Sequence, residues 1–168
     1  GRNRRPAFAE WRFAKGKGQG VMADIRHHII LRECVRVLIP VILLFALYVQ
    51  THGDFSPGGG FQAGVIFASG LILYGLVFGQ EALLEFAPLH ILARVMALGW
   101  LLYVGVGFAC LAMGGNYLEY YVLNADPLAG QHLGIFLIEL GVGVTVAATM
   151  VVIFICFTAR QLPAPADD

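Results

Sequence analysis

Charged residues are scarce in this chain. Lys, Arg, Asp and Glu make up 13% of its 168 residues, whereas 58% are hydrophobic and the mean hydropathy is +0.75. Water-soluble domains carry about 25% charged residues, so this composition predicts an integral membrane protein. The net charge is zero, and outside the N-terminal tail no basic patch is interleaved with aromatic residues. No nucleic-acid partner is therefore expected.

Groups that carry chemistry are scarce as well. The cysteines Cys34, Cys110 and Cys156 lie far apart and lack the spacing of metal ligands, so we interpret them as small apolar residues. No lysine follows the glycine run 58–60 in the manner of a nucleotide-binding loop. No pair of nucleophile and base is visible either. We expect no cofactor and no metal, and we expect that the chain is not an enzyme.

Long apolar stretches dominate what is present. A helix needs roughly 20 apolar residues to cross the hydrocarbon core of a bilayer, and four stretches qualify: about 29–50, 61–78, 93–113 and 134–157. The sequence therefore predicts an all-α membrane protein with four transmembrane helices in residues 29–158. Residues 1–28 would form a basic N-terminal extension and an interfacial lead-in, and residues 159–168 a short C-terminal tail.

The basic residues predict how these spans are oriented. Two of the three connections between the stretches, residues 52–60 and 114–133, contain neither Lys nor Arg. All of the basic residues fall on the opposite side, mostly before or at the start of the first stretch. Because basic loops stay on the cytoplasmic side, we predict that both termini are cytoplasmic.

The first stretch carries charge at its inner end. Residues 37–49 are too few to cross a bilayer alone, so the helix is expected to include Arg32 and Arg36. Both could extend to the lipid headgroups without any functional role; a functional role is the alternative. Pro40, one turn further on, is expected to kink the helix.

The connection after the first stretch has an unusual concentration of glycine. It reads His52-Gly53-Asp54-Phe55-Ser56-Pro57-Gly58-Gly59-Gly60-Phe61. Consecutive glycines are needed where the backbone takes positive φ or where another backbone approaches closely. Pro57 presets φ for a turn or for the first position of a helix. The motif Pro57, Gly58, Gly59, Gly60 and Phe61 is thus predicted to be a tight turn that fixes the second span against a neighbour.

Small residues one turn apart predict close helix packing. Gly75 and Gly79 form such a pair in the second stretch, as do Gly105 and Ala109 in the third. Gly64 with Ala68, and Gly99, extend the same pattern. Pairs of this kind allow helices to approach closely in lipid. We expect these residues at helix interfaces, and we expect much of the surface to meet other membrane proteins.

Glu139 is the one charge well inside an apolar stretch. An ionisable side chain there is costly and usually faces a cavity, a partner or an ion path. His132 precedes it by seven residues and so lies on nearly the same helical face. His52 and Asp54 belong to the same side of the membrane. Three interpretations stay open: a neutral Glu139 bonded to a neighbouring helix, a proton or cation path, and a salt bridge between subunits.

These features, taken in order, resemble a known family. The arginine-flanked first span with Leu31 to Pro40, then Tyr48 and His52-Gly53, then Pro57 to Gln62, are similar to the MnhB-like family, whose members are subunits of the Mrp (Mnh) multisubunit cation/proton antiporters. Related subunits occur in membrane-bound hydrogenases. The resemblance covers roughly residues 30–157. Two departures are Ala63-Gly64, where the family commonly has a second glycine pair, and the added charge of Asp54.

The resemblance implies an accessory integral-membrane subunit in the bacterial plasma membrane. Its partners would be the other subunits of the antiporter complex and membrane lipid, and the complex would transport Na⁺ or K⁺ and H⁺. The larger subunits of such complexes carry lysine and glutamate relays that this chain lacks. Two alternatives remain: the equivalent subunit of a redox-driven complex of the hydrogenase type, and a purely structural subunit with no ionisable group in the ion path.

Overall fold

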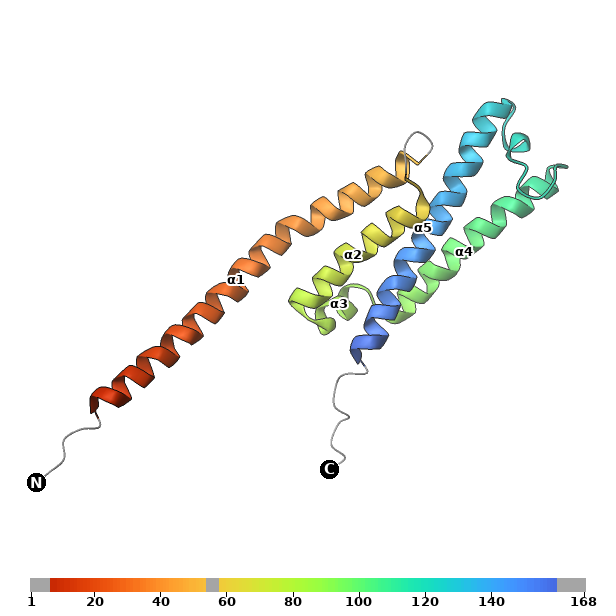
Figure 1. The fold of residues 1–168 in the computed structure, drawn as a ribbon. Helices are drawn as coiled ribbons and strands as arrows, with labels where there is room; N and C mark the ends of the chain where they lie inside the picture. The colour runs from red at the N-terminus through yellow and green to blue at the C-terminus, as the bar shows by residue number, and fades with distance from the viewer. Residues whose placement is uncertain (1–6, 54–57, 160–168) are drawn as a thin grey trace, which may run out of the picture.

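The computed structural model describes residues 7–53 and 58–159, and it describes side chains from residue 29 onward except at 54–57 and 159. Every regular element in this part of the chain is helical (Figure 1). The elements are α1 (Ala7–Thr51), α2 (Gly60–Phe78), α3 (Gln80–Phe86), α4 (Leu89–Ala112), the 3₁₀ helix η1 (Tyr120–Leu123) and α5 (Pro127–Ala159). The predicted all-helical class is confirmed. Asp54 and Pro57 lie outside the described residues.

Helix α5 is the centre of the arrangement. Helices α2 and α4 both pack along α5, α1 packs along α2, and η1 covers the first turns of α5 (Figure 1). Helix α1 touches α5 only slightly. A single helix therefore organises the rest of the bundle.

Three of the described helices are long and apolar enough to cross a membrane: α2, α4 and the segment Pro127–Thr158 of α5. They contain the second, third and fourth predicted spans. The first predicted span is part of α1, which runs on through Pro40 without a break in the helix. The side chain of Pro40 is exposed.

The ends of these helices follow from local sequence. Gly79 ends α2 with φ 102°, a conformation that glycine adopts without strain, and its N–H donates to the Gly75 carbonyl at 3.1 Å. At the start of α5, the Asp126 carboxylate accepts a hydrogen bond from the Leu128 N–H at 3.1 Å. Pro127 takes the first helical position, where its missing N–H is harmless.

Helix α3, which contains Glu81 and Glu85, lies between the second and third predicted spans, where no helix was predicted. The segment is a two-turn helix whose Leu83 is fully buried, at 0% exposed. Leu83 joins a core cluster with Ala68, Leu92, Val151 and Ile155. Both glutamates are exposed, as a solvated segment requires. With seven residues, α3 is too short to show a helical repeat of apolar residues in the sequence.

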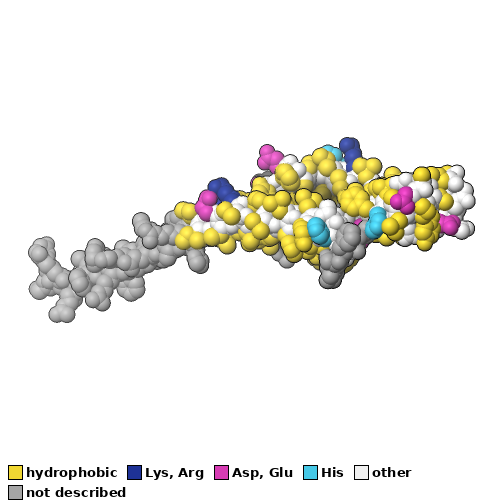
Figure 2. Space-filling view, turned by 90° about the horizontal axis from the view of Figure 1, so that it is seen from above, with side chains coloured by type: hydrophobic (Ala, Val, Ile, Leu, Met, Phe, Trp, Pro, Cys, Tyr) yellow, Lys and Arg dark blue, Asp and Glu magenta, His cyan; other side chains and the backbone are white. Residues whose placement is uncertain are grey.

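Hydrophobic side chains cover much of the face of the molecule that Figure 2 shows. Large hydrophobic side chains such as Phe45, Leu76, Phe108 and Phe157 are each more than half exposed. Exposed apolar area on this scale is far above that of a monomeric soluble protein. It fits a chain whose helices face lipid and other membrane proteins.

Candidate functional site

Glu139 of α5 lies against the glycine-rich connection between α1 and α2. A Cβ added to Gly53 would overlap its carboxylate, and a Cβ added to Gly59 would lie 3.4 Å from Oε1. Gly59 has φ 139°, which also excludes most side chains. The connection therefore supplies a cradle of bare backbone around the Glu139 carboxylate. We call Gly53, Gly59, Gly60 and Glu139 the glycine cradle.

The backbone of the same glutamate makes the closest contact between α2 and α5. A Cβ on Gly60 would overlap the Glu139 carbonyl, and a Cβ on Gly64 would lie 2.5 Å from the Gly143 carbonyl oxygen. Both pairs are one turn apart on their helices, as expected for helices that cross at small residues. The glycine run thus holds the start of α2 against α5 of the same chain, while Phe61 is 61% exposed.

Glu139 lies at different depths along the two helices that meet there, α5 and α2. It stands twelve residues after Pro127, about 18 Å along α5. Yet it lies beside Gly60, the first residue of α2. The carboxylate is therefore deep with respect to α5 and shallow with respect to α2, at the boundary between the connection and the apolar bundle.

Gln50 adds a polar group that sequence reasoning missed. It is 8% exposed, and its Oε1 would lie 2.5 Å from a Cβ added to Gly143, one turn after Glu139. Its Nε2 is buried and has no hydrogen-bond partner among the residues that the structure describes. The only sequence signal is a glutamine at the end of an apolar stretch, which is also typical of an exposed helix end.

His52 and His132, the two histidines predicted to lie near Glu139, are at the same end of the bundle. The His52 ring stacks on Tyr48 with centroids 4.1 Å apart, and its Nδ1 is 3.2 Å from the Tyr48 carbonyl oxygen. His132 is exposed on α5, two turns before Glu139. His52, His132 and Glu139 each take part in an interaction. Asp54, the fourth predicted member of the group, lies outside the described residues.

Arg36 belongs to the other end of the bundle. It forms an ion pair with Glu33 at 2.7 Å, and its guanidinium lies 5.9 Å from the centre of the Phe78 ring. Arg32 lies over the same ring at 5.7 Å. Phe78 ends α2 and Gly60 begins it, so about 27 Å of helix separates these arginines from Glu139. Arg36 cannot neutralise Glu139 at that distance.

The residues expected at helix interfaces fall into two groups. Gly75 is buried against Leu83 and Phe154. Gly79 acts as a helix end, and Gly105 and Ala109 are exposed; a Cβ on Gly105 would meet nothing within 4 Å. Within this chain, α4 uses other glycines for its contacts.

Helix α5 carries glycines on two opposite faces. Gly141 lies against Gly99 and Tyr103 of α4, whereas Gly143, two residues on, lies against Gln50 and Gly60. Two residues correspond to about 200° around a helix, so the faces point apart. One face of α5 therefore packs against α4. The opposite face carries Glu139, against which the glycines of the glycine cradle lie.

The chain is also similar to proteins of a known family. Residues 30–152 match the family described as a domain related to the MnhB subunit of Na⁺/H⁺ antiporters. The chain belongs to the MnhB family. This confirms the resemblance drawn from the sequence. The MnhB match includes Gln50, the glycine cradle and Gly143.

Named relatives of this MnhB-family chain are similar over most of their length. The B-type subunit of the Na⁺/H⁺ antiporter of Alkalihalophilus pseudofirmus is 30% identical, over 73% of this chain and 91% of the relative. The putative antiporter subunits mnhB2 of Staphylococcus epidermidis and Staphylococcus aureus are 30% and 32% identical, each over 79% of this chain and 96% of the relative.

Proposed function

We propose that this chain is an accessory integral-membrane subunit of a multisubunit cation/proton antiporter in a bacterial plasma membrane. The observation that carries the proposal is the family match over residues 30–152, with relatives that are themselves named as antiporter subunits of this type. Three apolar helices of membrane-crossing length support the location. The partners are the other subunits of the complex, surrounding lipid, and Na⁺ or K⁺ with H⁺ as transported ions.

Co-purification tests membership of the complex. The chain, tagged at its C-terminus and extracted in mild detergent, should bring down the other antiporter subunits. Recovery with redox subunits instead would assign it to a complex of the hydrogenase type. Recovery of the chain alone would contradict both assignments.

The proposed topology has four spans, with the first in α1 and both termini in the cytoplasm. It rests on the lack of Lys and Arg in residues 52–60 and 114–133. In a background where Cys34, Cys110 and Cys156 are replaced, single cysteines at Ser56 and Leu128 should react with an impermeant thiol reagent added outside intact cells. Reaction from the cytoplasmic side only would contradict this orientation.

The accessory role follows from how few ionisable groups the spans contain. Glu139 is the one acidic residue in α2, α4 and α5 taken together. A path across the bilayer needs successive sites that accept and release the ion. The larger part of the path is therefore assigned to other subunits.

Glu139 is the candidate for a direct part in proton or cation passage, with His132, His52 and Asp54 as neighbours at the same end. Three features support this. The carboxylate lies at the boundary between a connection and the apolar bundle, its cradle presents backbone rather than bulky side chains, and Arg32 and Arg36 lie at the other end of α2. A carboxylate kept in such surroundings is costly without a function.

Substitution at Glu139 tests this part. Glu139→Gln keeps the shape and removes the charge, so the assembled complex should lose most of its antiport. Glu139→Asp keeps the charge and should retain a measurable part of it. Unaltered antiport in the Gln variant, with normal assembly on native gels, would show that Glu139 is structural.

A further inference from the structure

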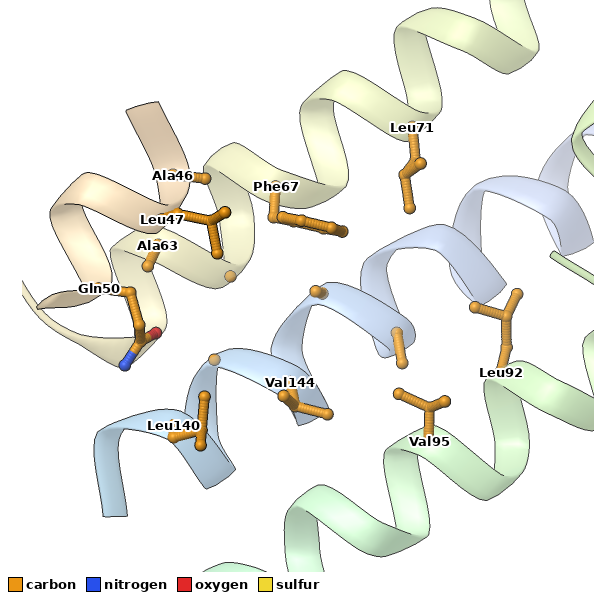
Figure 3. A pocket seen from close by; sticks show the side chains of 14 residues that line it. Ala46, Leu47, Gln50, Ala63, Phe67, Leu71, Leu92, Val95, Leu140 and Val144 are labelled. Carbon is orange, nitrogen blue, oxygen red and sulfur yellow. The ribbon is translucent and has the colours of Figure 1, made fainter. Parts of the chain in front are cut away.

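A cavity of about 300 Å³ lies between α1 and α2 on one side and α4 and α5 on the other (Figure 3). It is lined by side chains such as Leu47, Phe67, Leu92, Val95 and Val144, and by small residues of α2 and α5. Among the described residues that line it, Gln50 is the one with a polar side chain. The cavity forms where α1 follows α2 and makes little contact with α5.

Water does not suit this cavity. A buried water needs two to four polar partners, and cavities lined by Leu and Phe stay dry and take up apolar molecules. Here one amide at one end faces a lining that is otherwise apolar. The cavity is therefore unsuited to a hydrated ion path, and its chemistry favours an apolar occupant.

The volume of the cavity fits a hydrocarbon chain. A cavity of about 150 Å³ accommodates benzene, so twice that volume accommodates an extended chain of about twelve carbons.

Gln50 marks where a polar end would sit. Gln50 is 8% exposed, and its Nε2 can donate a hydrogen bond for which the described part of the chain supplies no acceptor. It stands in the last turn of α1, and Figure 3 places its amide at the end of the cavity near Leu140. An ester carbonyl at the head of an acyl chain is an acceptor of the kind that such an amide requires.

We propose that this cavity binds one acyl chain of a membrane phospholipid and that Gln50 Nε2 donates a hydrogen bond to its ester carbonyl. The bound chain would fill the space between α1 and α5, which protein side chains leave open. This proposal rests on the chain being in a membrane and does not depend on Glu139 or on antiport.

The test uses the intact complex reconstituted with a phosphatidylglycerol that carries a diazirine near the end of one acyl chain. After illumination, adducts should map to α2, α4 and α5 residues that line the cavity. Ala147→Leu narrows the cavity and should lower that yield roughly tenfold, the effect of losing two buried methylene contacts. Ala109→Leu makes the same change on an exposed part of α4 and should leave the yield unchanged. Equal yields in both variants would overturn the proposal.

A second measurement decides the matter if Ala147→Leu does not fold. In the complex that carries the exchange Phe67→p-benzoyl-phenylalanine, illumination should produce adducts with the mass of a phospholipid. Adducts with a neighbouring subunit would show that a protein side chain occupies the cavity. Absence of any adduct would show that the cavity is empty, and either result would overturn the proposal. In addition, Gln50→Leu should weaken the retention of phospholipid by the complex during delipidation. Unchanged retention would show that the proposed Gln50 hydrogen bond does not contribute to lipid binding.

Discussion

Gly60 of α2 lies directly against the backbone of Glu139 in α5, with no space for a Cβ between them. The glycine run and the acidic residue in the fourth span, more than seventy positions apart in the sequence, are thus parts of one contact. The glycine cradle exists because α2 approaches α5 this closely at its first residue. Whatever Glu139 does in the complex, its position depends on this contact.

Gly60→Val should therefore destabilise the protein severely. The new side chain meets backbone atoms, which cannot change rotamer, so the cost is at least that of ordinary overpacking, about 1–3 kcal/mol. Assembly of the complex on native gels and the thermal stability of the purified complex should both fall. Gly105→Val is the matched control, because a Cβ there meets nothing within 4 Å in this chain; equal effects at the two positions would contradict the packing.

The contact between α4 and α5 leads to a second prediction, which compares two glycines of α4. A Cβ on Gly99 would lie 2.8 Å from the Gly141 carbonyl oxygen, whereas Gly105, six residues on, is exposed. Gly99→Leu should lower the thermal stability of the chain, and Gly105→Leu should not. If instead Gly105→Leu stops assembly without loss of stability, that face of α4 contacts a neighbouring chain of the complex.

Gly53→Ala tests the role of the Glu139 carboxylate independently of the backbone contact between Gly60 and Glu139. The added methyl group would meet the carboxylate oxygens of Glu139, which are the mobile end of a side chain. We expect the complex to assemble normally while the rate or the pH profile of antiport changes, because the carboxylate must move. Assembly and antiport both at wild-type levels would indicate that the position of this carboxylate is unimportant for transport.

Tyr120 predicts a loss of stability at alkaline pH. The Tyr120 ring lies against Gly134 of α5. Its burial, followed by repulsion from Tyr103, Cys110 and Tyr117, raises the pKa of its phenol above the ordinary value of 10.0. The folded state thus holds this proton more tightly than the unfolded state does. The contribution of protonated Tyr120 to the free energy of unfolding is fully present below pH 10.0 and is lost as the pH rises through the raised pKa.

The thermal stability of the wild type should accordingly fall above about pH 10, and Tyr120→Phe should remove this part of the fall. Replacement of Tyr121, which is exposed, by Phe serves as the control. An identical alkaline profile for the wild type and Tyr120→Phe would show that the phenol ionises without consequence.

Features that depend on local sequence could be predicted well. The start of α2 was expected at Phe61 and lies at Gly60, because a glycine run followed by an apolar stretch marks a helix entry. Glu139 could be singled out because charge is rare in an apolar stretch.

Features that depend on which faces meet could not be predicted. The sequence named Gly99, Gly105 and Ala109 alike, yet α4 binds α5 through Gly99, since a small residue matters only where a second helix lies against it. Gln50 gave no signal because a glutamine at the end of a span is ordinary; its burial comes from Gly143, ninety-three positions later. The partner of the glycine run, Glu139, likewise emerged only from the fold.

Reconstitution in liposomes tests the assignment as an accessory antiporter subunit most directly. Vesicles that contain the complete complex should exchange Na⁺ or K⁺ for protons, followed by a pH-sensitive dye when salt is added. Vesicles with the complex lacking this chain, and vesicles with this chain alone, should show no exchange. Cation/proton exchange by the purified chain alone would contradict the account.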